Sequence, residues 1–316
     1  MNELIPLLQN LVGLDQAGVV EFITDWGGPL GSWIVLQLVL IFSGIRNGLK
    51  LALVVTIAFI TNSWLKWVIV EPRPFHIDHT LTSFGGVGDF GMPSGHAQGA
   101  AAFWGALGWI WRERKWLLFS LVLFAIVVGL SRVYLAVHSP AQVLVGLVIG
   151  FAIAGVVLGY WDWLTGRLFS LAWSTRWWLL VTVTLVVFLL NEAVLLVHAG
   201  FVAPELWLQG FAKAEGLATA QPADLQLFAN STVLIGGMGA GFGVLALLNE
   251  RWPCEVSRMG QKWLAFLGAV IGNLLFIVAL GMIFESALMW MMFVIAVWHP
   301  VIALYGPMRL VAISVK

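Results

Sequence analysis

Residues 116–137 read WLLFSLVLFAIVVGLSRVYLAV, a nearly unbroken run of apolar side chains in which Arg132 is the one charge. A helix needs about 20 mainly apolar residues to cross the hydrocarbon core of a bilayer, so this run predicts a membrane-spanning helix. The whole sequence has the same character, because 60% of its 316 residues are hydrophobic and only 10% are charged. Helices satisfy their own backbone polar groups in lipid. We therefore expect an all-α integral membrane protein surrounded by a lipid bilayer.

About eight further segments are apolar and long enough to be candidate spans. With the first run included, the candidates are residues 29–45, 49–70, 95–111, 116–137, 140–160, 177–198, 230–248, 263–284 and 287–307. They predict a helical bundle of about nine transmembrane spans. We expect three regions: an amphipathic N-terminal segment at residues 1–24 that lies on the membrane surface, a core at residues 25–160, and additional spans at residues 161–316 with an external loop near 199–229.

The basic residues predict the orientation of this bundle. Twelve of the 16 lysine and arginine residues fall on one side of it when the spans alternate in direction. These are Arg46, Lys50, Arg112, Arg114, Lys115, Arg167, Arg176, Arg251, Arg258, Lys262, Arg309 and Lys316. The positive-inside rule assigns their side to the cytoplasm, so we expect the amino terminus outside and the carboxyl terminus inside.

Four basic residues remain, of which Lys213 lies in an ordinary loop and the other three do not fit that pattern. Lys66, Arg73 and Arg132 lie near the outer ends of expected spans, where a cation is unfavourable unless it has a partner. Each of them by itself could extend its charged group to the membrane surface. Three cations at a similar depth instead indicate a pocket for an anion, and a guanidinium group matches the geometry of phosphate.

A second candidate element opens the expected span at 95–111. Residues 92–96 read MPSGH, so the helix would begin with backbone N–H groups that have no partner within the helix and can bind phosphate. Gly95 would let the backbone approach a ligand closely. Ser94 could bind the same ligand, or it could do no more than cap the helix.

The third element is the sequence SRVYLAVH at residues 131–138. Ser131 and His138 are seven residues apart, which is about two helical turns, so they can share a face. Pro140 is suited to begin the next helix. A histidine at the end of a span is usually structural. His138 becomes a candidate catalytic residue because three cations and His96 are expected at the same depth.

Together these segments resemble the signature of the type 2 phosphatidic acid phosphatase family, which shares its site with the vanadium haloperoxidases. The signature is K-x6-R-P, then P-S-G-H, then S-R-x5-H-x3-D. The matching residues are Lys66, Arg73, Pro74, Pro93, Ser94, Gly95, His96, Ser131, Arg132 and His138. The resemblance covers about residues 50–160 and implies that the core is a phosphatase without a cofactor.

The resemblance also implies roles for these residues. His138 would be the nucleophile that forms a phosphohistidine, and His96 would be the general acid and base. The phosphate would be held by Lys66, Arg73, Ser94, Gly95 and Arg132. Three fixed cations can replace a metal ion, so we expect metal-independent hydrolysis. A metal site at His76, Asp78 and His79 is a weaker alternative, because no further ligand completes it.

One position departs from the signature, since Gln142 stands where the family has an aspartate. Its amide oxygen can accept a hydrogen bond from the ring of His138 and so orient it, but it supplies no negative charge. The stretch 131–146 and a nine-span layout with an outside amino terminus both resemble the glucose-6-phosphatase branch of the family.

The sequence therefore predicts a membrane phosphomonoesterase with its site at the external or lumenal face, expected to be the periplasmic face of a bacterial inner membrane. A lipid phosphate is the favoured substrate and a sugar phosphate the alternative. Gln142 leaves a non-catalytic phosphate-binding protein or transporter open. Vanadium haloperoxidase chemistry suits so hydrophobic a bundle less well. The net charge of zero gives no indication of a nucleic-acid partner.

Overall fold

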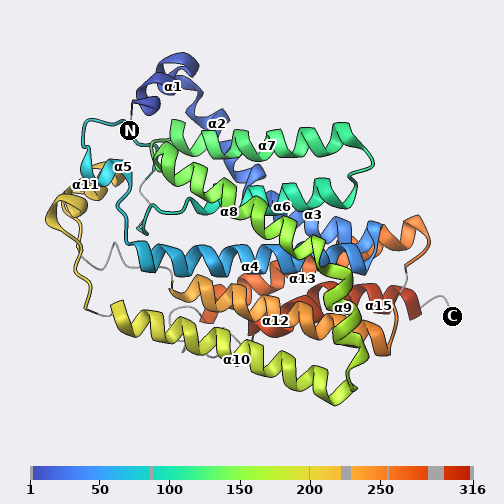
Figure 1. Ribbon diagram of the computed structural model, residues 1–316. Coiled ribbons are helices and arrows are strands. Elements are labelled where there is room, and N and C mark those ends of the chain that lie inside the picture. The colour runs from blue at the N-terminus through green and yellow to red at the C-terminus, as the bar shows by residue number, and fades with distance from the viewer. Residues whose placement is uncertain are drawn as a thin grey trace. The chain divides into compact units, whose positions relative to one another are not determined.

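The computed structural model describes residues 3–85, 88–198, 200–221, 229–254, 256–283 and 295–313. Every regular element within these residues is helical (Figure 1), so the expected all-α architecture is confirmed. The chain divides into two compact units. Unit 1 comprises residues 1–32, 57–158 and 193–228, and unit 2 comprises residues 33–56, 159–192 and 229–316.

Six helical segments of the described residues are long and apolar enough to cross a membrane. They are Ile45–Ile77, Lys115–Tyr134, Pro140–Gly159, Trp173–His198, Met259–Phe276 and Ile295–Ala312. A seventh is possible if Leu14–Gly27 and Pro29–Ser43, which are bent by 41° at their junction, form one span. These segments support an integral membrane protein. The count of nine spans and the direction of the termini stay predictions, and the expected span at 287–307 lies partly outside the described residues.

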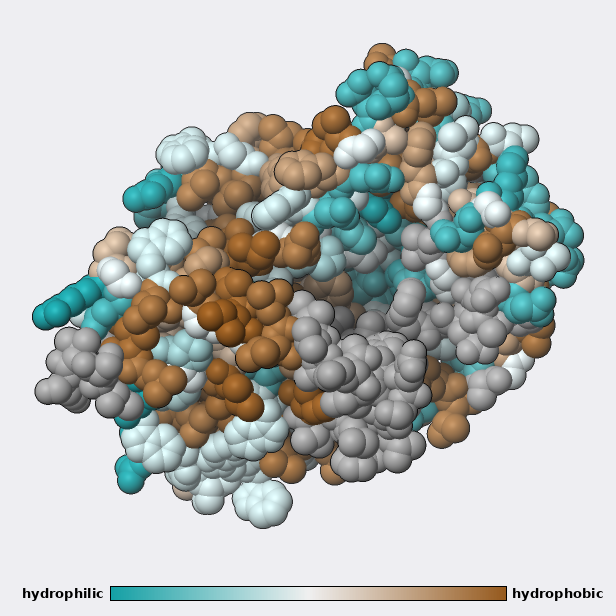
Figure 2. All heavy atoms as spheres, turned by 180° about the vertical axis from the view of Figure 1, so that it is seen from behind, coloured by the Kyte–Doolittle hydropathy of each residue, from teal (hydrophilic) through white to brown (hydrophobic). Residues whose placement is uncertain are grey.

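Apolar side chains also gather on the surface, where they are brown in Figure 2. Helix α10 (Trp173–His198) gives the clearest series of exposed large hydrophobic residues: Val181, Val183, Leu185, Val186, Leu189 and Leu190. An apolar surface of this extent is unfavourable in water and is the surface that lipid covers. The composition of the surface therefore agrees with the hydropathy of the sequence.

The motif residues all lie in unit 1, on α6 (Gly95–Ile110), on α7 (Lys115–Tyr134), on the last part of α4 (Ile45–Ile69), and at the starts of α5 (Pro74–Ile77) and α8 (Pro140–Gly159). Helix α6 packs along α7 (Figure 1), and almost all of its residues from 97 to 108 are buried. Helix α8 approaches α6 closely at Gly150, where a Cβ atom would lie 2.3 Å from the main-chain oxygen of Gln98. Helix α6 is therefore a short helix of 16 residues that is covered mainly by protein within unit 1.

The N-terminal segment differs from a single helix lying on the membrane. It comprises α1 (Leu4–Val12), the 3-10 turn Leu14–Gln16 and α2 (Ala17–Gly27), and both α-helices pack against α7. Ile5 is fully buried, and Gln9 Nε2 donates to the main-chain oxygen atoms of Thr82 and Tyr134 at 2.8 Å each. One face of this segment is thus part of the core of unit 1, while Leu7 on another face is exposed.

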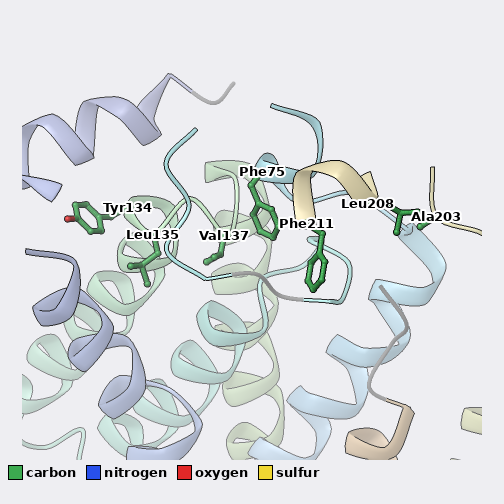
Figure 3. Packing of buried hydrophobic residues seen from close by; sticks show 7 residues of the cluster. All are labelled: Phe75, Tyr134, Leu135, Val137, Ala203, Leu208 and Phe211. Carbon is green, nitrogen blue, oxygen red and sulfur yellow. The ribbon is translucent and has the colours of Figure 1, made fainter. Parts of the chain in front are cut away.

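The expected external loop near 199–229 contains a helix, α11 (Glu205–Glu215), that packs against the short helix α5 (Pro74–Ile77). Residues 199 and 222–228 lie outside the described part. Figure 3 shows an apolar cluster to which α11 contributes, formed by Phe75, Tyr134, Leu135, Val137, Ala203, Leu208 and Phe211. Because Phe75 lies two residues after Arg73 and Val137 directly precedes His138, this cluster holds the backbone next to two motifs.

Unit 2 holds the remaining helices. They are α3 (Pro29–Leu38, from residue 33), the π-helical turn η2 (Val39–Ser43), the first part of α4 (Ile45–Ile69), α9 (Trp161–Ser170), most of α10, α12 (Ala229–Arg251), α13 (Met259–Ile283), η4 (Pro300–Tyr305) and α15 (Gly306–Ile313). Asn273 links two of them, because it accepts from Trp33 Nε1 at 2.8 Å and donates to Gln37 Oε1 at 3.0 Å. This polar contact has an interhelical structural role.

Candidate active site

The serine of the second motif stands at the start of α6 but does not cap it. Ser94 is the N-cap residue and has an extended backbone, yet its side chain makes no capping hydrogen bond. Its hydroxyl is fully buried and has no hydrogen-bond partner among the described residues. Buried polar groups are normally paired. A buried, unpaired hydroxyl beside the free N–H groups of a helix is therefore placed to meet a ligand.

Side chains from neighbouring helices hold this motif in place. Asn62 Nδ2 of α4 donates to the main-chain oxygen of Pro93 at 3.2 Å and to Gln98 Oε1 at 2.9 Å. The backbone N–H of Ser94 donates to the main-chain oxygen of Gln142 at 3.0 Å. The start of α6 is thus tied to both α4 and α8. The motifs did not predict Asn62, although a polar residue inside an expected span was a usable signal.

Arg73 joins the first motif to the third. Only 2% of its surface is exposed. Its Nε donates to the main-chain oxygen of Asp89 at 2.9 Å, and one terminal nitrogen donates to that of Val137 at 2.8 Å. The same terminal nitrogen lies 2.9 Å from Nε2 of His138. The structure therefore places the guanidinium group directly beside the predicted nucleophile.

A carboxylate that belongs to no motif offsets part of the positive charge. Asp89 forms ion pairs with both Lys66 and Arg73, and all three side chains are largely buried. Burial by itself raises the pKa of a carboxyl group, but the charges of Arg73 and Lys66 outweigh it and hold the pKa of Asp89 well below its usual range. An acidic residue between two motifs, in a chain with few charges, was the signal that could have identified it.

Arg132 and His96 reach the site from α7 and α6. Arg132 is buried, its terminal nitrogen donates to the hydroxyl of Thr24 at 3.4 Å, and its Nε has no partner within the described residues. His96 interacts electrostatically with Arg132. A Cβ atom at Gly28 would lie 2.7 Å from Cδ2 of His96, so the backbone of the N-terminal helices passes very close to this ring. These helices form one side of the site, which the sequence analysis did not predict.

The hydrogen bonds of His138 determine which ring nitrogen carries the proton. A guanidinium group can only donate, so Nε2, at 2.9 Å from Arg73, must accept. The proton is then on Nδ1, which donates to the main-chain oxygen of Gly91 at 2.9 Å and faces Gln142 Oε1 at 3.2 Å. Burial, and then the neighbouring cations led by Arg73, lowers the pKa of His138 well below its usual range. The contacts therefore leave the lone pair on Nε2, and the lowered pKa favours the neutral imidazole.

Gln142 lies beside His138, and its own contacts fix the orientation of its amide. Nε2 donates to a carboxylate oxygen of Glu71 and to the main-chain oxygen of Pro72, both at 2.9 Å. Oε1 accepts from the backbone N–H of Ser139 at 3.1 Å and faces Nδ1 of His138. Because the Glu71 carboxylate and the Pro72 oxygen can only accept hydrogen bonds, the amide nitrogen of Gln142 must face them, and its oxygen must face the histidine.

Gly91 provides the nearer acceptor for His138, and its lack of a side chain makes this possible. A Cβ atom at Gly91 would lie 2.4 Å from Nε2 of Gln142. The backbone N–H of Gly91 donates to the main-chain oxygen of Glu71 at 2.7 Å, so the loop is held on both sides. A glycine at this position therefore allows the loop and the amide to approach the histidine together.

The alternative metal site does not gain ligands in the structure. His76 Nδ1 faces the backbone N–H of Arg73 at 3.2 Å, and the carboxylate of Asp78 accepts from Thr80. His79 is engaged by the main-chain oxygen of Leu206 at 3.1 Å. In the part of the chain that the structure describes, no group of three or more His, Cys, Asp or Glu is arranged to hold a metal ion.

Comparison with known protein families identifies the region that carries these motifs. Residues 47–166 match the model of the PAP2 superfamily. This region of the chain is therefore similar to the PAP2 superfamily. The resemblance found in the three motifs is thereby confirmed, and the PAP2 region includes every predicted site residue from Lys66 to Gln142.

Several characterised proteins are similar to this PAP2 region. Glucose-6-phosphatase catalytic subunit 1 of Haplochromis nubilus is 36% identical over 142 residues, which cover 35% of this chain and 40% of that protein. Undecaprenyl-diphosphatase of Sulfolobus acidocaldarius is 32% identical over 136 residues, covering 42% and 65%. Undecaprenyl-diphosphatase BcrC of Bacillus subtilis is 33% identical over 105 residues, covering 33% and 52%. The chain thus spans 40 to 65% of the length of these relatives. No solved structure matches the chain.

Proposed function

We propose that this chain is a membrane-embedded phosphomonoesterase that works through a phosphohistidine at His138. The main support is the neutral imidazole whose Nε2 lone pair faces the guanidinium group of Arg73 at 2.9 Å. A phosphoryl group bound by Arg73 would lie next to that lone pair, which is the position that an attacking atom requires.

In the first step, a bond forms between phosphorus and Nε2 of His138 while the bond from phosphorus to the leaving oxygen breaks. His96 donates a proton to that oxygen, so the product leaves as a neutral alcohol. The Nδ1 proton of His138 stays in place, and the phosphorylated ring becomes cationic. The phosphoryl oxygens would be held by Lys66, Arg73, Ser94, Gly95 and Arg132.

In the second step, His96 accepts a proton from water while the water oxygen attacks phosphorus. The bond from phosphorus to Nε2 breaks, and inorganic phosphate leaves. The three cations stabilise the transition state in place of a metal ion, so a chelator should leave activity unchanged and vanadate should inhibit it. Loss of activity with a chelator, together with no effect of vanadate, would overturn the metal-independent mechanism.

A lipid phosphate is the proposed substrate class. Exposed apolar helices provide a surface along which a lipid can approach from the bilayer. Two relatives are named undecaprenyl-diphosphatases, which extends the class to lipid diphosphates. We place the reaction at the external face, on the periplasmic side of a bacterial inner membrane, because the positive-inside rule assigns the motifs to that side.

A sugar phosphate is the second candidate. The similarity to a glucose-6-phosphatase catalytic subunit at 36% identity favours it, as does the glutamine at position 142. A phosphate-binding protein or transporter without catalysis is the third candidate. Phosphate release separates this third candidate from the other two.

The test is a phosphate-release panel with purified protein in detergent. The substrates are phosphatidic acid, phosphatidylglycerophosphate, undecaprenyl phosphate, undecaprenyl diphosphate and glucose 6-phosphate. We expect the highest kcat/KM with a lipid substrate, and a covalent phosphohistidine that can be trapped with radiolabelled substrate. His138→Ala should abolish both signals, whereas His79→Ala, which changes a histidine outside the site, should keep them. Undiminished phosphate release by His138→Ala would refute the catalytic assignment.

A further inference from the structure

The histidine of the third motif lacks a carboxylate neighbour in the sequence but has one nearby in the structure. Gln142, at the position of the family aspartate, is neutral. Behind its amide lies the carboxylate of Glu71, with Oε1 2.9 Å from Nε2 of Gln142. The negative charge is therefore present one side chain further from the imidazole.

The contacts form a continuous chain with one chemically consistent direction. The ring N–H of His138 faces Oε1 of Gln142, and Nε2 of Gln142 donates to Glu71. An amide that donates to a carboxylate becomes more polarised, so its oxygen becomes a stronger acceptor. Each group in the chain therefore strengthens the next one in the direction of the imidazole.

Glu71 and Gln142 are also held firmly in relation to each other. Gln142 is buried, and its amide makes further hydrogen bonds to Pro72 and Ser139. The main-chain oxygen of Glu71 accepts from Gly91, whose own oxygen faces His138 Nδ1. Glu71 and the imidazole are thus linked by two routes, one from the carboxylate through the amide of Gln142 and one from the main-chain oxygen through the backbone of Gly91.

We propose that Glu71 is a positioning residue that supplies, through the amide of Gln142, the negative charge that stabilises the cationic ring of phosphorylated His138. This proposal rests on the phosphohistidine mechanism above. The charge matters only after the bond between phosphorus and Nε2 has begun to form, because the ring is neutral before that. The contribution of Glu71 therefore belongs to kcat and not to phosphate binding.

Glu71→Gln separates this role from a purely structural one. The variant keeps the size of the side chain and an oxygen that can accept from Gln142, so only the charge is lost. We expect kcat to fall about ten- to a hundredfold, the range for one hydrogen bond to a charged group. KM and the Ki of inorganic phosphate should stay within about twofold. Glu71→Asp keeps the charge at a changed distance and should retain more activity than Glu71→Gln. Glu205→Gln, an exposed substitution of the same kind, is the matched control.

Exchanging the two side chains provides the decisive comparison. In the double variant Glu71→Gln with Gln142→Glu, the carboxylate faces His138 directly and the amide lies behind it. We expect kcat to rise about tenfold above that of Glu71→Gln alone. Recovery should be partial, because Pro72 loses the donor that Gln142 supplies. The single variant Gln142→Glu brings two carboxylates together and should be slower than the double variant.

The results separate this proposal from the proposed function. A normal kcat in Glu71→Gln, or a double variant no faster than Glu71→Gln, would overturn the role of Glu71 while His138→Ala stays inactive. Full activity in His138→Ala would instead overturn the phosphohistidine mechanism. If Glu71→Gln no longer binds inorganic phosphate, the role is structural and the proposal is also rejected.

Discussion

Replacing Asp89 with asparagine should tighten the binding of phosphate. The carboxylate pairs with Lys66 and Arg73, two of the cations proposed to hold the phosphoryl group, and only 16% of this side chain is exposed. A phosphate anion that enters the site must share both cations with that carboxylate. At about 4 Å and an effective dielectric constant of about 20, one pair of like charges costs about 4 kcal/mol. Movement of the carboxylate reduces this cost, so we expect Ki to fall about ten- to a hundredfold, or about 1.4 to 2.8 kcal/mol.

The stability of the protein without phosphate should change in the opposite direction. Arg73 keeps its main-chain acceptors at Asp89 and Val137, but Lys66 loses its ion pair while it stays buried. Breaking one partner of a buried pair costs about 3 to 5 kcal/mol. Because asparagine still offers an oxygen acceptor, we expect a loss near the lower end of that range.

Two measurements test this prediction together. Inhibition by inorganic phosphate and by vanadate gives Ki, and thermal unfolding in detergent gives Tm with and without phosphate. Asp89→Asn should have the lower Ki, the lower Tm without phosphate, and the larger gain in Tm when phosphate is added. Asp78→Asn is the control, because its carboxylate bonds to Thr80 in a loop. An unchanged or higher Ki in Asp89→Asn would refute the competition between this carboxylate and phosphate.

Three further predictions follow from the site and its surroundings. Gly91→Ala should lower kcat about tenfold or more, because its Cβ would lie 2.4 Å from Nε2 of Gln142, whose amide is held by hydrogen bonds. Steady-state kinetics measure this change. A normal kcat would contradict the prediction and show that the loop can move away. The pKa of His138 is well below its usual range, mainly through burial, so its neutral form persists as the pH falls below about 6.5. The acid limb of kcat/KM, which reports the free enzyme, should therefore lie below pH 6.5, and a limb at or above that value contradicts the assignment. Ile5→Ala should destabilise unit 1 by about 2 to 4 kcal/mol, because this side chain is fully buried against the third motif; thermal unfolding measures the loss, and the exposed Leu11→Ala should show almost none.

Much of the architecture follows from patterns that are local in the chain. The expected spans at 116–137 and 140–160 agree with α7 and α8 within a few residues, because length and apolar composition identify a helix that faces lipid. Helix α6 shows the limit of this argument. Its sequence is mainly apolar, but it is buried in unit 1 and has only 16 residues. Hydropathy measures the character of a side chain and does not tell whether protein or lipid covers it.

The residues of the site likewise divide into those that the sequence predicted and those that it did not. The similar depth of the motif residues in the membrane predicted that Arg73 and His138 belong to one anion site, and the structure brings them to 2.9 Å. Glu71, Asp89 and Gly91 were not predicted, because their contacts join segments that are far apart in sequence. Gly91 meets His138 across 47 positions, and Glu71 meets Gln142 across 71. The motifs contain the residues that we propose to bind the phosphate, and they leave out the residues that position those side chains.

The glutamine that departs from the signature is explained by this wider set of contacts. An aspartate at position 142 could accept from His138, but it could not donate to Glu71 or Pro72. It would also place a second carboxylate against Glu71, and like charges in a largely buried site are costly. Gln142 has both a donor and an acceptor, so it can lie between an imidazole and a carboxylate and satisfy each of them. The aspartate of the family and the Gln142–Glu71 pair are then two ways of presenting one negative charge to the same histidine. Which residue suits position 142 depends on whether position 71 carries a carboxylate.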